Sequence, residues 1–263
     1  MKKNKLSLVS SIFFLVLAFV FIYAPIVSIV TFSFNNQRSG TQWGGFTFKW
    51  YQNFFTNQAI LKALSVTLII AVSATLISVI IGTLAAISSL RFTKKTRNAL
   101  FMINDLPIIN PDIVTAICLF LLFGVFLIPG GYATLLLAHI AFCVPYVLIT
   151  VYPKVRSLDP NLSEAARDLG ATQLQTLFKV ILPQIKGSIA AAAAIAFTMS
   201  FDDFVISYFA VGDSGITNIS IYLYKLKRGL DPTINALTTI IIVVITIIVG
   251  LNYIISNRKK GEE

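Results

Sequence analysis

The segment LSEAARDLGATQLQTLFKVILPQIKG, residues 162–187, is the most water-compatible long stretch in a chain that is otherwise apolar. Its charged residues are Glu164, Arg167, Asp168, Lys179 and Lys186. Charged side chains are costly inside a lipid bilayer, so this segment is predicted to lie outside it. The chain therefore keeps a polar insert between apolar regions, and the fold has to accommodate both.

The insert is predicted to form two short helices with a turn between them. Asn161 or Ser163 can cap the first helix, and Gly170 can end it. The second helix is expected over residues 172–181, where four apolar side chains share one face. These are Leu174, Leu177, Phe178 and Ile181. Pro183 is then expected to break the chain before the next apolar segment.

The composition of the whole chain is that of a membrane protein with several spans. Of its 263 residues, 56% are hydrophobic and 12% are charged, whereas a soluble domain carries about 25% charged residues. A membrane helix needs about 20 mostly apolar residues. Six segments reach this length, at about 8–32, 64–90, 99–127, 132–152, 188–210 and 234–256. The sequence therefore predicts an all-α membrane protein with one transmembrane domain over residues 1–263.

The basic residues predict which ends of the spans face the cytoplasm. With the N-terminus inside, fifteen of the 21 Lys and Arg residues fall in cytoplasmic segments. This distribution agrees with the positive-inside rule. It also accounts for the net charge of +10 without a nucleic-acid partner, for which no binding pattern is present. Both termini and residues 91–98 and 153–187 are then cytoplasmic, while residues 33–63 and 211–233 are external.

The insert also resembles a known family of membrane proteins. It contains Glu164-Ala165-Ala166, three further residues, Gly170, nine further residues, and then VILP at 180–183. This pattern is similar to the EAA loop of ABC importer permeases, which has isoleucine where this chain has Val180. The resemblance implies a type I ABC importer permease fold, with residues 153–187 as its cytoplasmic coupling loop.

The same resemblance implies how the loop works and which chains work with it. In that family the loop docks on an ATP-hydrolysing subunit. The coupling residues carried over are Glu164, Ala165, Ala166, Gly170, Leu182 and Pro183. The implied assembly contains a second permease subunit, two ATPase subunits and an external binding protein, in a bacterial plasma membrane. This chain lacks the phosphate-binding pattern G-x-x-x-x-G-K-[ST], so ATP and Mg are expected on the ATPase, with no cofactor, metal or catalytic residue here.

Four acidic residues fall inside predicted spans, where each costs about 2.5–3.5 kcal/mol and usually marks a pathway or a partner. They are Asp105, Asp112, Asp202 and Asp203. Asp112 and Asp202 are expected at similar depths, about 20 Å along their spans. Pro107 and Pro111 should interrupt the third span, and Asp112 can alternatively cap the helix that resumes there. On one continuous helix Asp202 and Asp203 point about 100° apart, so one is expected to bind substrate and the other to hydrogen-bond a neighbour.

Further segments are similar to the spermidine/putrescine permeases within that family. They are NNQRSGTQWGGFTFKWY, NPDIV, AHIAFCVPYVLITVY, SEAARDLGA and FDDFVISYFAVG. This resemblance spans nearly the whole chain and implies a polyamine substrate. A polyamine is a flexible polycation, which carboxylates and aromatic rings suit through ion pairs and cation–π contacts. The predicted substrate path comprises Asp112, Asp202, Asp203, Phe201 and Tyr208, with Phe197 and Phe209 as further aromatic candidates.

Other functions are compatible with parts of this pattern. The same importer scaffold could carry another small solute. An ion-coupled secondary transporter could use the aspartates, but it is expected to contain inverted repeats, and none is found between residues 1–130 and 131–263. An intramembrane aspartyl protease needs a glycine-rich context that NPDIV and SFDDFV lack. His139, the single histidine, is expected to pack or hydrogen-bond within its span.

Overall fold

The computed structural model describes residues 5–226 and 231–260, and these form helices joined by turns and loops, with one isolated β-bridge between Asn35 and Phe46. The elements are α1 (Lys5–Phe32), α2 (Lys49–Thr56), α3 (Gln58–Ser89), α4 (Lys94–Ile109), α5 (Asp112–Val125), α6 (Tyr132–Arg156), α7 (Leu162–Asp168), α8 (Gln173–Thr176), the π-helix η1 (Leu177–Ile181), α9 (Leu182–Asp202), α10 (Val205–Val211), α11 (Ile219–Lys225) and α12 (Pro232–Lys260). They form two compact units, Met1–Leu61 with Leu226–Glu263, and Lys62–Lys225.

The described residues hold four helical segments that are long and apolar enough to cross a membrane. They are Ser10–Phe32, Gln58–Ser89, Tyr132–Arg156 and Gln173–Asp202. The bent pair of α4 and α5 makes a fifth if it counts as one span, and the apolar segment Pro232–Ile247 of α12 is shorter. The structure thus supports an all-helical membrane protein with four or five such segments in its described part, where the sequence predicts six.

The first unit contains α1, α2 and α12, together with the loop 33–48 between α1 and α2, which is rich in aromatic residues. The α12 helix packs against both α1 and α2. The Trp50 indole is buried and donates from Nε1 to the carbonyl of Asn35 over 2.6 Å. The Asn35 amide in turn bonds the backbone of Gln42 and Gly44, each over 2.7 Å. The loop is therefore held in place by its own polar contacts.

The second unit is built on the contact between α6 and α9. The α6 helix buries residues on several faces, and α9 places the small residues Ala192 and Ala196 against the core. Small side chains let two membrane helices approach closely. Gly82 of α3 serves the same purpose, because a Cβ there would lie 2.7 Å from Val147 of α6. Three helices thus pack tightly at the centre of this unit.

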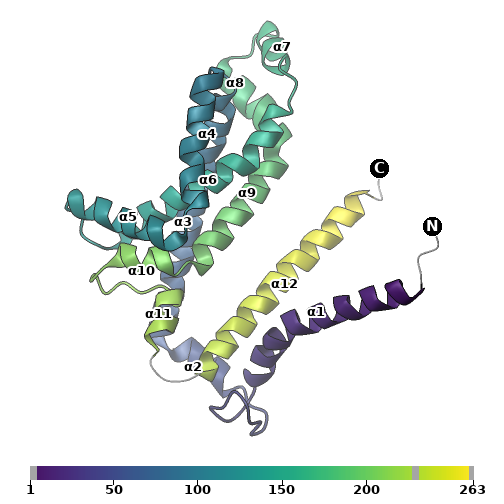
Figure 1. Cartoon of the computed structure of the whole chain (residues 1–263), viewed down its shortest axis with the longest axis vertical. Coiled ribbons are helices and arrows are strands. Elements are labelled where there is room, and N and C mark those ends of the chain that lie inside the picture. The colour runs from purple at the N-terminus through teal and green to yellow at the C-terminus, as the bar shows by residue number, and fades with distance from the viewer. Residues whose placement is uncertain (1–4, 227–230, 261–263) are drawn as a thin grey trace. The chain divides into compact units, whose positions relative to one another are not determined.

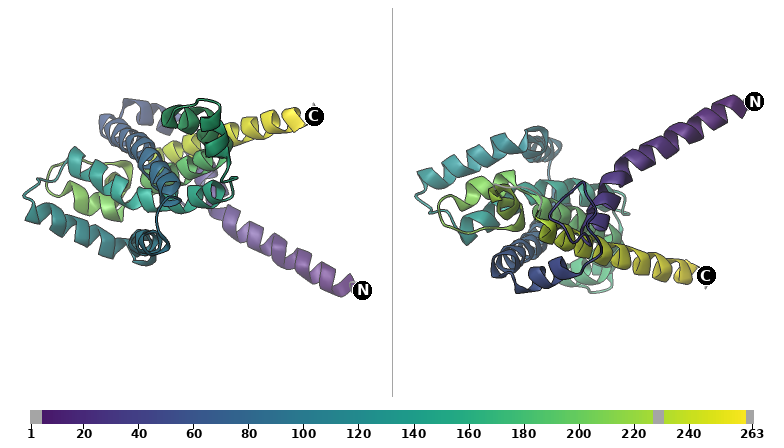
Figure 2. Two further views of the ribbon diagram at one scale, coloured as in Figure 1. Left: turned by 90° about the horizontal axis from the view of Figure 1, so that it is seen from above. Right: turned by 90° about the horizontal axis from the view of Figure 1, so that it is seen from below.

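The second unit places its polar insert and its broken helices at different ends. Figure 1 shows α7 and α8 at one end, beyond α4, and α5 beside α10 toward the other. Both views in Figure 2 show α5 and α10 side by side. The two groups of predicted functional residues therefore belong to separate regions of one unit.

Candidate functional site

The polar insert begins with α7, which ends in the tight turn that the sequence predicts. Gly170 has φ +82°, a left-handed conformation that glycine adopts without strain. Its N–H donates to the Arg167 carbonyl over 2.8 Å, and the Ala171 N–H donates to the Ala166 carbonyl over 3.0 Å. Asn161 is the residue that precedes α7, but its side chain makes no capping bond.

The second half of the insert differs from its prediction. A capping box formed by Thr172 and Gln175 starts α8 as expected. The predicted break at Pro183 is wrong, because the helical run from Gln173 continues to Asp202. Proline lacks an N–H for the usual helical bond, and the π-helix η1 just before it widens the turn so that Pro183 sits in the first turn of α9.

This π-turn also changes which apolar side chains of the insert face outward. Leu177 and Ile181 are half-buried, while Leu174 and Phe178 are exposed, so the predicted common face is split. Leu169 between the two helices is 90% exposed. Glu164 and Ala165 of α7 are exposed as well. The insert therefore presents a charged helix and three large apolar side chains to its surroundings.

The third predicted span is interrupted at Pro111, as predicted, but the predicted interruption at Pro107 is wrong, because that residue lies inside α4. The α4 helix ends at Ile109, α5 begins at Asp112, and the two are bent by 108°. Pro111 precedes the first residue of α5, so its missing N–H costs no helical bond. Asp112 is exposed and makes no capping hydrogen bond. The alternative in which Asp112 caps α5 through its side chain is therefore wrong.

The fifth predicted span is interrupted without a proline or a glycine. Its continuous course over 188–210 is a wrong prediction, because α9 ends at Asp202 and α10 begins at Val205. Asp203 lies between them with an extended backbone. Its carboxylate accepts from the N–H groups of Ile206 over 3.2 Å and Ser207 over 2.7 Å. Because Asp203 caps α10 in this way, the two adjacent acids do not share one helix.

Those two acids differ in exposure. The Asp203 side chain is 8% exposed, whereas Asp202 is exposed. Asp112 begins α5, Asp203 precedes α10, and these two helices pack against each other. The two interrupted spans are therefore neighbours in this unit.

A buried histidine stands next to Asp203. His139 of α6 is 1% exposed, and its Nε2 lies 3.6 Å from Oδ2 of Asp203. The same nitrogen lies 2.9 Å from the Ser207 hydroxyl, and Nδ1 lies 2.6 Å from the Ser200 hydroxyl. His139 is thus a hydrogen-bonding residue, as predicted, and its bonds connect α6 to α9 and α10.

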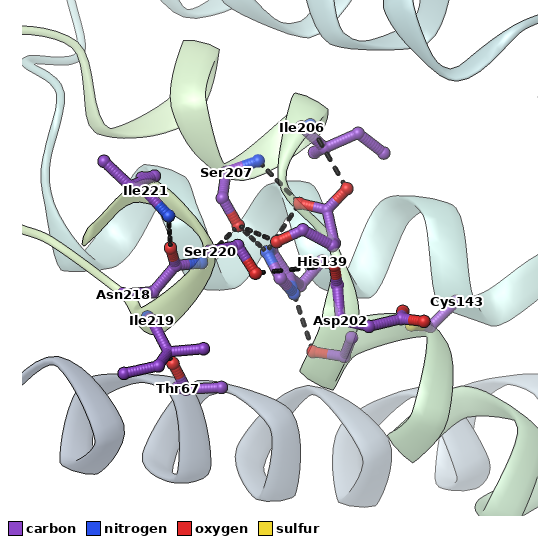
Figure 3. Close-up of polar contacts among 12 residues, drawn as sticks. Thr67, His139, Cys143, Asp202, Ile206, Ser207, Asn218, Ile219, Ser220 and Ile221 are labelled. Atoms are coloured by element: carbon purple, nitrogen blue, oxygen red, sulfur yellow. Dashed lines mark hydrogen bonds and ion pairs between the residues drawn. The ribbon is translucent and has the colours of Figure 1, made fainter. Parts of the chain in front are cut away.

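The contacts extend from His139 to the segment before α11. Asn218 donates from Nδ2 to the Ser207 hydroxyl over 2.8 Å and accepts from the Ile221 N–H over 2.9 Å. The Ile219 N–H donates to the Thr67 hydroxyl of α3 over 2.9 Å. Figure 3 shows the Asn218 side chain and the His139 ring both pointing toward Ser207, with Ile219 beside Thr67 of α3. We call His139, Ser200, Asp203, Ser207 and Asn218 the junction network.

Aromatic rings cover the exposed side of this region. Phe197 and Phe201 stack with their ring centroids 5.7 Å apart. Tyr208 contacts Phe209 at 5.8 Å and Tyr224 at 5.6 Å. The predicted aromatic candidates therefore flank the α9–α10 junction, although they form two separate groups. In the described part of the chain no set of three or more His, Cys, Asp or Glu side chains could hold a metal ion.

Residues 78–261 match the family model described as binding-protein-dependent transport system inner membrane component. This match covers more than half of the chain, including the insert and both interruptions. The chain belongs to this family. It is a membrane component of a transport system, in agreement with its apolar helices.

Two relatives of this transport component carry more specific names. The spermidine/putrescine transport system permease protein PotC of Haemophilus influenzae is 36% identical over 94% of this chain and 96% of its own length. The putrescine transport system permease protein PotI of Escherichia coli is 35% identical over 91% of this chain and 89% of its own length. The match to PotC agrees with the resemblance inferred from sequence segments alone.

A solved structure supports the fold of the transport component. It belongs to a bacterial ABC transporter involved in the import of the acidic polysaccharide alginate. The TM-score is 0.78, with coverage of 96% of this chain and 98% of the other. Sequence identity is only 16%, so this likeness concerns the permease fold alone.

Sequence reasoning singled out the acids of the transport component but missed most of the junction network. Ser200, Ser207 and Asn218 were not among the predicted site residues. The available signal was polar side chains at 200 and 207, on both sides of the acidic pair in an apolar region. Such polar residues in a span find partners within the protein, and here that partner is His139.

Proposed function

We propose that this chain is the membrane-spanning permease subunit of an ATP-driven importer for polyamines, spermidine or putrescine. The observation that carries the proposal is the 36% identity with PotC over 94% of the chain. The structure adds two exposed carboxylates, Asp112 and Asp202, beside the α9–α10 junction. A substrate with several positive charges needs negative groups along its path, because bare cations are costly to bury.

The substrate path in this proposal runs past the two interrupted spans. Asp112 and Asp202 offer carboxylates to the ammonium groups, and Asp203 adds negative charge from a buried position. Phe201 and Tyr208 contribute ring faces, which attract cations. Tyr208 is 43% exposed, so its ring is available to a ligand. The path alternates between access from outside and access from the cytoplasm as the ATPase turns over.

The insert is the coupling element in this proposal. Its exposed side chains Leu169, Leu174 and Phe178 form an apolar surface beside the helix that carries Glu164. Exposed apolar patches rimmed by polar residues are typical of protein interaction sites. The occupant we infer is one of two ATPase subunits, which hold ATP and Mg. Ala165 and Ala166 allow close approach, while Gly170, Leu182 and Pro183 set the direction of the chain on either side.

The proposed arrangement in the membrane has six spans and both termini in the cytoplasm. Residues 91–98 and 153–187 are cytoplasmic, and residues 33–63 and 211–233 are external. The distribution of Lys and Arg supports this orientation. A second permease subunit completes the path, and an external polyamine-binding protein delivers the substrate in a bacterial plasma membrane.

Charge reversal at the coupling surface tests the proposal. Glu164→Lys should abolish uptake of labelled spermidine in cells, because it opposes docking without touching the spans. Asp213→Lys provides the matched control, since it reverses an exposed acid far from the insert and should leave ATPase docking intact. Spermidine-stimulated ATP hydrolysis of the assembled transporter is the second readout. Normal uptake and normal stimulation in Glu164→Lys would contradict the coupling assignment.

The substrate assignment has its own measurement. Uptake of labelled spermidine is challenged with excess unlabelled putrescine, spermidine, amino acids or sugars. Competition by the polyamines alone supports the proposal. Competition by another class of solute, with no effect of polyamines, would assign the same permease scaffold to that solute instead.

A further inference from the structure

The adjacent acids Asp202 and Asp203 are surrounded differently. The Asp203 carboxylate accepts hydrogen bonds from the N–H groups of Ile206 and Ser207, and its side chain is nearly buried. Asp202 is the last residue of α9 and is exposed. Its side chain makes no hydrogen bond in the described structure, and its backbone carbonyl accepts from the Ser220 hydroxyl over 3.4 Å. The side chain of Asp202 is therefore free for a ligand, and that of Asp203 is already used.

The hydrogen bonds assign a proton to one nitrogen of His139. Nε2 faces both the Ser207 hydroxyl and an oxygen of the Asp203 carboxylate. A bare nitrogen lone pair at that position would be repelled by the carboxylate. The Ser207 hydroxyl already accepts from Asn218 and can accept from Nε2 as well. Nε2 therefore donates toward Asp203 and Ser207, while Nδ1 pairs with the Ser200 hydroxyl.

The junction network can satisfy the polar backbone groups at the break between α9 and α10. Residues 203 and 204 lie outside α9 and α10, and non-helical backbone at membrane depth persists only where the protein satisfies its polar groups. The junction has no proline or glycine to enforce the break. Asp203 bonds the free N–H groups of α10, and His139 stabilises the buried carboxylate that does so. Without them a continuous helix through residues 202–205 becomes the favoured alternative.

We propose that His139 and Asp203 are positioning residues, which hold the α9–α10 break open so that the Asp202 carboxylate stands where an ammonium group of the substrate can bind it. Ser200, Ser207 and Asn218 complete the arrangement from α9, α10 and the segment before α11. This inference rests on the proposed function for the identity of the cation. The positioning role itself depends only on the contacts of His139 and Asp203 within this chain.

The position of residue 202 can be measured without relying on uptake. Asp202→Cys is introduced together with Cys118→Ser and Cys143→Ala, and the assembled transporter is treated in membranes with 2-aminoethyl methanethiosulfonate, a cationic thiol reagent. The thiol at position 202 should react readily with this reagent. His139→Leu should change the reaction rate by about fivefold or more, because its loss breaks several buried hydrogen bonds. His139→Gln, which retains a donor and an acceptor, should restore part of the original rate.

Thr198→Val is the matched control. The Thr198 hydroxyl is exposed and bonds only the Ala194 carbonyl of its own helix, so its loss should leave the reaction rate unchanged. An unchanged rate in His139→Leu, at normal membrane levels, would overturn the positioning role. A second measurement separates the two proposals. If His139→Leu alters the rate while Asp202→Asn takes up labelled spermidine as the parent does, the positioning role holds and the polyamine path past Asp202 fails.

Discussion

The α4–α5 and α9–α10 interruptions lie in one region of the second unit, yet they are made by different means. Pro111 enforces the first one through its ring and its missing N–H. The second contains neither proline nor glycine and is held by Asp203, His139 and Ser207. A break made by proline leaves its neighbouring acid free, whereas a break made by side chains uses one acid. The exposed Asp112 and the buried Asp203 illustrate the two outcomes.

The largest contrast is expected in stability. Asp203→Leu removes the acceptor of two N–H groups and leaves His139 without its carboxylate, a loss of about 2 kcal/mol or more. The melting temperature of the purified transporter should fall by about 5 °C or more. Asp112→Leu removes an exposed carboxylate that caps nothing, so its melting temperature should stay within about 1 °C of the parent. Equal drops in melting temperature in the two variants would contradict the difference proposed between the two interruptions.

Replacing the proline should have a smaller effect. Pro111→Ala removes the constraint of about 3 kcal/mol against a continuous helix, so the bend between α4 and α5 should relax in part of the molecules. Uptake of labelled spermidine is expected to fall several-fold as Asp112 leaves its position, with little change in membrane level. The control is Pro129→Ala in the loop before α6, which interrupts no helix. Full uptake by Pro111→Ala would show that the proline does not maintain the first break.

A single hydroxyl of the junction network should matter least. Ser207→Ala removes a partner of both His139 and Asn218, and the loss of one buried hydrogen bond costs about 1 kcal/mol. The expected drop in melting temperature is about 2–4 °C. Ser220→Ala is the control, because that hydroxyl makes a single long bond at a less buried site. A Ser207→Ala variant as stable as the parent would show that the network is redundant.

The sequence predicted those features that follow from local chemistry. Pro111 indicated the first interruption, because the residue before a proline is disfavoured in a helix, whereas Pro107 lies inside α4 without ending it. Gly170 predicted the turn after α7, since many helices end at a glycine with a left-handed backbone conformation. The apolar segments and the basic residues between them indicated a membrane protein of several spans.

The features that depend on tertiary contacts were not predictable in the same way. The second interruption needs His139 of α6 beside Asp203, residues that lie far apart in the chain. The π-helix before Pro183 keeps α9 continuous where the sequence rule predicts a break. In both cases a partner or a backbone adjustment overrides the local preference. The sequence predicted that only one of Asp202 and Asp203 hydrogen-bonds a neighbour, but not which one, because Asp203 is selected by the second interruption.

The most direct test of the account is spermidine uptake by cells that carry Asp202→Asn at the membrane level of the parent protein. Asparagine keeps the shape of the side chain and removes the charge that the substrate is proposed to meet. Uptake should fall about tenfold or more, because the charge-assisted hydrogen bonds between the carboxylate and the ammonium group are lost. Basal ATP hydrolysis and the melting temperature should remain those of the parent, since the Asp202 side chain supports no other group. Unchanged uptake in Asp202→Asn would contradict the role of the exposed acid at the α9–α10 junction.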